Sequence, residues 1–271
     1  MAMSKKHRVL EFIFEKYFNG NPEFQKSILF TLNDISEGYS FTNQKEPASI
    51  SNTILDLVRK KKPITSRLPD SIIKWGYDLK KRTGPSKNGN LAGEFVYVGK
   101  GNEINSWLTW QSNFDYNITI DTNCLPRKIN RYLRTDEGAI FSVMDYCDVL
   151  SHALNEKSQS IKRIQHPIKL QPNEIDGFYC NLDKNIIYPV EAKALSTKDD
   201  INLDQMNGGV SVVKDMFRDE IIIPLAVRMV KNALNIAEFY PCNFHSKEDN
   251  SLKVKSFINV SFQPKIYSWD L

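Results

Sequence analysis

The chain has 271 residues, of which 41% are hydrophobic and 25% charged, and its formal net charge is +4. This composition excludes a collagen, a disulfide-rich scaffold and a wholly disordered chain, and without a run of ~18 apolar residues no membrane span or membrane partner is expected. The four cysteines lie far apart with no Cys-x-x-Cys pair, which indicates no zinc knuckle and favours a reduced, cytoplasmic protein.

Charge is unevenly distributed along the chain. The first 100 residues carry 17 basic and 10 acidic side chains, which leaves 19 basic and 22 acidic side chains for the rest. Because lysine and arginine replace the counterions of a polyanion, contact with a polyanion is expected mainly from the first part. The acidic balance of the second part suits a site that holds cations. The alternative is that both balances are scatter of surface charge.

Helices dominate the expected structure of the first 100 residues. Apolar residues at helical spacing, with helix-start and helix-stop signals, predict four helices, over residues 4–18, 23–35, 47–62 and 69–77. A polar, glycine-rich turn then precedes a strand over residues 94–98. Several short helices, a strand and a polar loop are compatible with a winged-helix-like DNA-binding domain, which lays one helix in the major groove. A generic helical subdomain has the same periodicity and stays the alternative.

Basic residues near the third helix are the candidate DNA contacts. This helix ends in a run of four basic residues, and such a run is more often a solvated helix end than a DNA contact. Further positive charge follows nearby, which strengthens the interpretation as a DNA-binding surface. The candidate DNA-binding residues are Arg59, Lys60, Lys61, Lys62, Arg67, Lys81 and Arg82.

The rest of the chain begins with a polar segment and continues with alternating elements. Residues 101–136 are interrupted by glycine and proline and are expected to be a connector, with at most a short strand at 117–120. The further elements expected are a long helix over 137–154, a strand near 166–170, a helix over 202–217 and a buried strand over 220–230. This alternation predicts an α/β fold with a mixed sheet flanked by helices.

The most informative pattern is a hairpin with three charged residues. Two strands, Ile175 to Cys180 and Ile186 to Ala194, are separated by a five-residue loop. Since side chains alternate along a strand, Glu191 and Lys193 point to one face, and pairing across the hairpin can bring Asp176 beside them. Their apolar neighbours indicate a half-buried strand, in which an unpaired glutamate and lysine would be costly.

Two carboxylates and a lysine on one face are suited to metal-dependent hydrolysis of a phosphodiester. Carboxylate oxygens bind a hard cation such as Mg²⁺, which lowers the pKa of a bound water and neutralises charge that develops on the phosphate. The lysine can orient the attacking water or stabilise the pentavalent phosphorus centre. Asp176, Glu191 and Lys193 are therefore the candidate catalytic residues, with Asp176 and Glu191 as ligands of Mg²⁺. A structural ion pair is the alternative.

An aspartate, a spacer and Glu-Ala-Lys resemble the PD-(D/E)xK nuclease superfamily, and the surroundings resemble a group of type II restriction endonuclease-like proteins. The matching segments are Asp136 to Ile140 before a long helix, Ile164 to Pro167, Glu174 with Asp176, Pro189 to Lys193, and Gln205. In that group a winged-helix-like domain precedes the nuclease core. The resemblance covers residues 130–230 well and residues 47–100 loosely. It departs at Ile175, where the family pattern has proline.

The resemblance also implies roles for individual residues. Asp176, Glu191 and Lys193 would form the metal-and-water triad, and Gln205 would be an accessory residue on the next helix. Glu137 would be the helix-borne acid that reaches the metal in many members of the superfamily. Glu174 is a competing carboxylate at the same strand.

These observations predict a Mg²⁺-dependent endonuclease of type II restriction type that cuts double-stranded DNA at a specific site. The expected organisation is a winged-helix-like domain over residues 1–100, the connector 101–136 and a nuclease domain over residues 137–271. A homodimer is expected by family analogy, because cutting both strands of a palindrome needs two symmetric active sites. No nucleotide cofactor is expected, since the phosphate-binding Gly-x-x-x-x-Gly-Lys-Ser/Thr motif is absent. The alternatives are a non-catalytic winged-helix regulator and a DNA-repair or junction nuclease with the same core.

Overall fold

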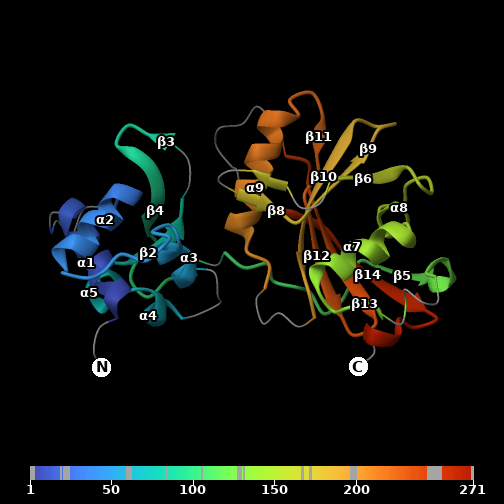
Figure 1. Ribbon diagram of the computed structural model, residues 1–271, viewed down its shortest axis with the longest axis horizontal. Coiled ribbons are helices and arrows are strands. Elements are labelled where there is room, and N and C mark those ends of the chain that lie inside the picture. Colours follow the sequence, from blue (N-terminus) through green and yellow to red (C-terminus); the bar gives the residue numbers. More distant parts are fainter. Residues whose placement is uncertain are drawn as a thin grey trace. The chain divides into compact units, whose positions relative to one another are not determined.

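The computed structural model (Figure 1) describes most of the chain, and the chain divides into two compact units, Met1–Ser106 and Trp107–Leu271. The described residues are 4–18, 20, 25–58, 63–82, 85–104, 106–126, 130, 132–165, 168–170, 173–195, 200–242 and 252–269, without the side chains of 85, 165, 168–170, 173, 174 and 267. The division falls inside the predicted connector 101–136, most of which belongs to the second unit. Each unit has a hydrophobic core of its own.

The first unit combines helices with a small antiparallel sheet. Its elements in chain order are α1 (Lys5–Tyr17), β1 (Ile28–Thr31), α2 (Leu32–Phe41), α3 (Asn52–Val58), α4 (Ile64–Arg67), α5 (Asp70–Ile73), β2 (Tyr77–Lys81), β3 (Pro85–Ser86) and β4 (Gly89–Tyr97). β4 lies between β1 and β2, and β3 pairs with its first residues. Aromatic packing links α1 to this sheet, since the ring of Phe14 meets Tyr77 and Phe95 edge-on.

The start of the second helix differs from the sequence prediction. A helix was expected over residues 23–35, but Ile28–Thr31 pairs with β4 as β1 and the helix begins at Leu32. Thr31 and Asp34 form a capping box, in which the N–H of Thr31 donates to Asp34 Oδ2 at 2.7 Å. The cap determines where the helix begins, and pairing with β4 overrides the helical periodicity before it.

Two further expectations for the first unit are met only in part. The helix expected over 47–62 is present as α3, and residues 59–62 lie outside the described ranges. The helix expected over 69–77 is shorter, because α5 is followed by a turn at Gly76, whose φ is +81°. A Cβ at Gly76 would approach the backbone of Gly99 and Lys100 to within 3 Å, so only glycine fits this turn.

The second unit is built around a mixed sheet. Its elements in chain order are β5 (Tyr116–Asp121), η1 (Thr122–Cys124), α7 (Glu137–Tyr146), α8 (Val149–Ala153), β6 (Ile161–Gln165), β7 (Ile168–Leu170), β8 (Asn173–Ile175), β9 (Gly177–Asn181), β10 (Ile186–Lys193), α9 (Leu203–Met216), β11 (Ile221–Ile222), β12 (Leu225–Val230), β13 (Ala233–Phe239), β14 (Val254–Gln263) and η2 (Tyr267–Trp269). Among the described residues eight strands form this sheet, in the order β5-β14-β13-β12-β10-β9-β6 with β11 beside β10. β7 and β8 pair separately.

The centre of the sheet contains both pairing modes. β6, β9 and β10 are antiparallel neighbours in chain order, whereas β12 runs parallel to β10. A parallel neighbour needs a crossover connection, which here contains α9. The far strands β13 and β14 are antiparallel, and the edge strand β5 is parallel to β14.

Helices pack on both faces of this sheet (Figure 1), and the two faces have different neighbours. Side chains of α7 and α8 share a core cluster with Val190 and Ala192 of β10, while α9 packs on the face that carries Ile187. Because side chains alternate along β10, Glu191 and Lys193 lie on the face of Ile187. None of the helices in the described ranges combines the length and the apolar character that a bilayer crossing requires.

Most elements predicted for this unit are confirmed. The long helix over 137–154 is present as α7 and α8, separated at Asp148, whose φ is +49°. The hairpin and the helix that follows it are present as β9, β10 and α9. The strand expected near 166–170 is represented by β6 and β7, and the one over 220–230 is divided into β11 and β12. β13 and β14 were not predicted.

Candidate active site

Asp176 lies at the bend between β8 and β9. The β9–β10 register pairs Gly177 with Val190, so the next residues along, Asp176 and Glu191, are level across the two strands. Asp176 Oδ2 accepts a hydrogen bond from the backbone N–H of Ala192 at 2.9 Å. This bond holds the aspartate against β10, between the two residues that the sequence predicts as its partners.

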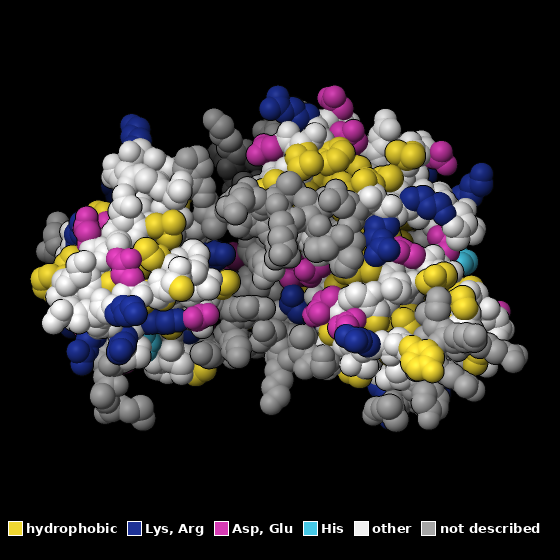
Figure 2. Space-filling model, viewed as in Figure 1, with side chains coloured by type: hydrophobic (Ala, Val, Ile, Leu, Met, Phe, Trp, Pro, Cys, Tyr) yellow, Lys and Arg dark blue, Asp and Glu magenta, His cyan; other side chains and the backbone are white. Residues whose placement is uncertain are grey.

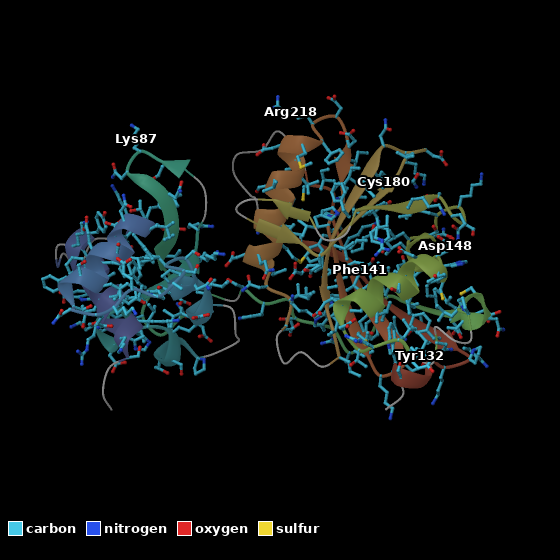
Figure 3. The ribbon with its side chains drawn as sticks, in the orientation of Figure 1. Lys87, Tyr132, Phe141, Asp148, Cys180 and Arg218 are labelled. Carbon is cyan, nitrogen blue, oxygen red and sulfur yellow. The ribbon has the colours of Figure 1, made fainter. Side chains whose placement is uncertain are left out.

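Gly177 allows β9 to approach helix α7 closely. A Cβ atom at this position would overlap the ring of Phe141, which Figure 3 marks on α7. Phe141 is fully buried, so its ring has no free space to move into. The glycine therefore lets α7 pack directly on β9 at the residue that follows Asp176.

Glu191 and Lys193 form a close ion pair at the end of β10. Lys193 Nζ lies 2.7 Å from Glu191 Oε1, and the two side chains are 18% and 5% exposed. Two residues separate them along the strand, so they share one face. A charge pair with so little water around it is costly to break from one side, because the remaining charge would lose its partner.

Glu137 reaches the same strand end from helix α7. Asp136 begins this helix, since its Oδ1 caps the N–H of Ala139 at 2.9 Å. The next residue, Glu137, accepts a hydrogen bond from the backbone N–H of Ala194 at 3.4 Å. Ala194 directly follows Lys193, so the helix-borne acid lies near the ion pair.

The electrostatics of the group centre on Lys193. Burial lowers the pKa of this lysine, but the charges of Glu191 and Asp176, the hydrogen bond with Glu191 and the charge of Glu137 outweigh it. The net result is a pKa of Lys193 above its ordinary value, so the side chain is an ammonium at neutral pH. The structure thus brings three acidic side chains within electrostatic reach of one cation.

The donor set of this group suits a hard divalent cation. Asp176 and Glu191 offer oxygen atoms, and Mg²⁺ is commonly bound through one or two carboxylates, with water and substrate phosphate as its other ligands. Within the described ranges, no group of three or more His, Cys, Asp or Glu side chains is arranged to enclose a metal ion. The residues present therefore fit the two-carboxylate mode of Mg²⁺ binding and not a closed protein cage.

Gln205 and Glu174 have less defined positions in this site. Gln205 lies in the first turn of α9, where its backbone N–H donates to Asn202 Oδ1 at 3.1 Å. Its side chain is exposed and makes no hydrogen bond with the described residues. The side chain of Glu174 lies outside the described part of the chain. The structure therefore brings Asp176, Glu191, Lys193 and Glu137 together and leaves Gln205 facing solvent.

Sequence reasoning missed a second cation beside Lys193. β12 runs parallel to β10, and its register pairs Arg228 with Lys193. The guanidinium carbon of Arg228 lies 4.5 Å from the ring centroid of Trp110, whose Nε1 donates to Asp200 Oδ1 at 3.0 Å. Burial lowers the pKa of Arg228, and the charge of Asp200 opposes this effect. The signal in the sequence is a single arginine inside an apolar strand, but its alignment with Lys193 depends on the register.

Arg67, one of the candidate DNA contacts, has a structural position in the first unit. Its side chain is 10% exposed, and its Nη2 lies 3.0 Å from Asp78 Oδ2 and 3.2 Å from Glu103 Oε2. Asp78 is fully buried. Its guanidinium is already bonded to two carboxylates, and losing it would leave the buried Asp78 without its partner, so we leave Arg67 out of the proposed DNA-contacting residues.

The other candidate DNA contacts differ in accessibility. The run from Arg59 to Lys62 lies outside the described residues. Lys81 is half-buried, and burial lowers its pKa. Arg82 is more accessible, but its Nε donates to Glu94 Oε2 at 2.6 Å. Lys87 lies in the turn between β3 and β4 (Figure 3), and its side chain is exposed, so this hairpin presents an accessible cation.

The surface charge of the second unit is mixed. Over the visible face in Figure 2, acidic and basic side chains are interspersed. The unit carries 19 basic and 21 acidic side chains in all. An anionic ligand would therefore be held by particular cations, such as Lys193 and Arg228, and not by a broad positive field.

No protein-family model matches the chain, and comparisons with curated proteins and with solved structures found no match. A functional assignment is therefore based on the sequence motif and on the geometry of its residues.

Proposed function

We propose that this chain is a Mg²⁺-dependent endonuclease of type II restriction type, which hydrolyses phosphodiester bonds of double-stranded DNA at a specific site. The observation that carries the proposal is the arrangement of Asp176, Glu191 and Lys193 at the meeting point of β9 and β10, with Glu137 close by. Acids and a lysine of the PD-(D/E)xK pattern are thus neighbours in space, with the lysine charged.

The order of elements around the site supports a restriction-endonuclease-like core. One helix (α7, continued by α8) precedes three antiparallel strands (β6, β9 and β10), and a second helix (α9) leads to a strand parallel to the third (β12). In this order of elements, Asp176 lies just before the second strand, and Glu191 and Lys193 lie at the end of the third. A generic structural ion pair does not require this convergence of elements.

The order of elements in the first unit supports its assignment as a winged-helix-like DNA-binding domain. It has a helix, a strand and further helices before a β-hairpin, and the strands pair in the order β1-β4-β2. Such a domain places one helix in the major groove, and α3 precedes the basic run that the sequence contributes. The turn with Lys87 at the β3–β4 hairpin would be the wing, which suits contact with the phosphate backbone.

The roles of the residues follow from their charges and positions. When bound, Mg²⁺ supplies a polarised phosphate and a water of lowered pKa. Asp176 and Glu191 would hold it, with Glu137 as the third acid within reach. As an ammonium, Lys193 does not accept the proton of the attacking water. It instead donates hydrogen bonds that orient this water and offset negative charge on the phosphate. As the water oxygen bonds to phosphorus, the water gives up a proton to solvent and the P–O bond to the leaving oxygen breaks. The leaving oxygen takes a proton from solvent, so the products are a phosphate monoester and a hydroxyl group.

We also propose that the active form is a homodimer. One site of this kind cuts one strand, and two sites related by a two-fold axis would cut both strands of a palindromic sequence. Cytoplasmic DNA would be the substrate, and hydrolysis needs no nucleotide cofactor.

A plasmid digestion tests this function. We expect discrete fragments with Mg²⁺ and none with EDTA, because the carboxylates need the cation. Lys193→Ala is expected to lower the cleavage rate by about 10²–10³-fold, since it removes a donor aimed at the reacting phosphate. Lys231→Ala is the matched control, because Lys231 lies exposed in the β12–β13 turn, and it should cut like the wild type.

The other outcomes of the digestion separate the alternatives. Intact DNA with every divalent cation would overturn the enzyme assignment. Sequence-specific gel retardation without cleavage would favour a winged-helix regulator. Cleavage of branched but not linear duplexes would favour a junction or repair nuclease with the same chemistry.

A further inference from the structure

Five polar side chains lie side by side across the sheet at the level of Lys193. They are Lys193 on β10, Arg228 on β12, Asn235 on β13, Asn259 on β14 and Asn117 on β5, and each is the register partner of the next. Register partners on adjacent strands point to the same face, so we call these five residues the polar row. The polar row begins at the proposed catalytic lysine and lies on the face that carries Glu191.

Two polar atoms near the beginning of the polar row have no hydrogen-bond partner in the described part of the chain. Arg228 Nε and Asn235 Oδ1 are buried and make no hydrogen bond with the described residues. Buried polar atoms are usually hydrogen-bonded, because leaving them unpaired is costly. At the other end of the row, Asn259 Nδ2 donates to Asn117 Oδ1 at 3.1 Å. Of the two unsatisfied atoms, Arg228 Nε is a donor that an anion can satisfy, and it belongs to the residue next to Lys193, whereas Asn235 Oδ1 is an acceptor that a phosphate oxygen does not satisfy.

Arg228 is held in place without an ion pair. Its guanidinium rests on the face of Trp110, which is itself fixed by the hydrogen bond to Asp200 and by ring packing on Phe257 at 5.9 Å. In the described part of the chain, no carboxylate lies within ion-pair distance of Arg228. Arg67, by comparison, pairs with a carboxylate at 3.0 Å. A half-buried guanidinium that is fixed by stacking has N–H donors left for an anion.

The spacing of the two cations suits a chain of phosphates. Neighbouring strands lie about 4.8 Å apart, so Lys193 and Arg228 present their charges one strand apart on one surface. A planar guanidinium matches the paired oxygens of a phosphate, and asparagine amides donate to phosphate and sugar oxygens. A single small anion would use one of these cations, whereas a phosphodiester backbone would use both. Asn235, the next residue of the polar row, is buried, so the proposed contact is limited to Lys193 and Arg228.

We propose that the Lys193 end of the polar row, formed by Lys193 and Arg228, is a binding track for the phosphodiester backbone of the DNA strand that is cut, with Arg228 holding the phosphate next to the one at Lys193. This inference rests on the proposed nuclease function and extends it, because it identifies where the strand lies on the sheet. Arg228 is a positioning residue in this scheme, and Trp110 sets the direction of its guanidinium.

Binding of a fluorescein-labelled DNA duplex in EDTA tests the track apart from catalysis. Fluorescence anisotropy over a salt series gives the Kd and the slope of log K against log [salt] for the full chain. We expect Arg228→Gln to weaken binding about tenfold and to reduce the slope by about 1, because one phosphate contact is lost. Arg228→Lys should keep the slope, since the charge remains, but bind more weakly because the planar fork is lost.

Arg218→Gln is the matched control, with the same change of charge at an exposed site just beyond α9 (Figure 3). It should bind like the wild type. A merely structural role of Arg228 would instead lower the melting temperature of both Arg228 variants and leave the salt slope unchanged.

The outcomes distinguish this inference from the proposed function. If the wild type cleaves DNA and Arg228→Gln binds with wild-type affinity and slope, the track is overturned and the nuclease stands. If the wild type binds but never cleaves, the nuclease is overturned, and weaker binding with a reduced slope for Arg228→Gln still supports the track. If the wild type binds no duplex, both are overturned.

Discussion

Lys193 combines burial with a surplus of nearby acids. Burial alone lowers its pKa, yet Glu191, Asp176 and Glu137 together raise it above the ordinary value. A lysine whose pKa is raised in the folded state stabilises that state fully below its unfolded pKa of about 10.4. This contribution is then lost as the pH rises from about 10.4 through the folded pKa. The ion pair is therefore expected to stabilise the fold at neutral pH.

Replacement of this lysine by methionine tests that expectation. Lys193→Met keeps the length of the side chain but leaves the acids without their cation, so at pH 7 in EDTA we expect the free energy of unfolding to fall by about 2–4 kcal/mol. The difference from the wild type should shrink as the pH rises from ~10.4, where the lysine of the unfolded state begins to lose its proton, through the higher pKa of the folded state. Urea unfolding followed by circular dichroism at pH 7, 9 and 11 measures it. A difference that is the same at all three pH values would contradict the assigned electrostatics.

At the scale of elements, the hairpin was predictable because its information is local. The alternation along β10 predicted that Glu191 and Lys193 share a face, and the short loop placed Asp176 opposite them. The location of Arg228 was not predictable, because it depends on the parallel register of β10 and β12, strands separated by helix α9. β1 was predicted as helix for the same kind of reason, since its partner β4 lies some 60 residues further along the chain. The features that the sequence did not predict are therefore those that depend on pairing between distant segments.

The contact between β9 and α7 gives a prediction for these two elements. Gly177→Ala would place a methyl group against the buried ring of Phe141, and overpacking of this kind costs about 1–3 kcal/mol of unfolding free energy. It should also weaken Mg²⁺-dependent cleavage, because β9 and with it Asp176 must shift. The double variant Gly177→Ala, Phe141→Leu should recover part of the stability, since the smaller side chain makes room. Urea unfolding of the wild type, the two single variants and the double variant gives the coupling free energy between the two positions. Purely additive effects on the free energy of unfolding would contradict the direct contact.

At the scale of the whole molecule, each of the two units has its own hydrophobic core, and the two units differ in net charge. The first unit, Met1–Ser106, carries 17 basic and 11 acidic side chains, whereas the second carries 19 and 21. The charge asymmetry seen in the sequence therefore coincides with a structural division. The first unit is basic, and the second is acidic and holds the candidate metal ligands. We therefore expect binding affinity and hydrolysis to reside in different parts of the chain.

Separating the units tests this division. Because each has its own buried core, we expect fragments 1–106 and 107–271 each to unfold cooperatively on heating. Fragment 1–106 should bind duplex DNA with an affinity that falls steeply with salt, since its net positive charge releases counterions. Fragment 107–271 should bind at least tenfold more weakly but keep Mg²⁺-dependent cleavage at high protein concentration, with lower sequence specificity.

Circular dichroism measures the unfolding of each fragment, fluorescence anisotropy its DNA affinity and plasmid digestion its cleavage. Equal DNA affinity of two folded fragments would contradict the assignment of binding to the first unit, and specific cleavage by fragment 107–271 alone would show that this unit reads the sequence itself.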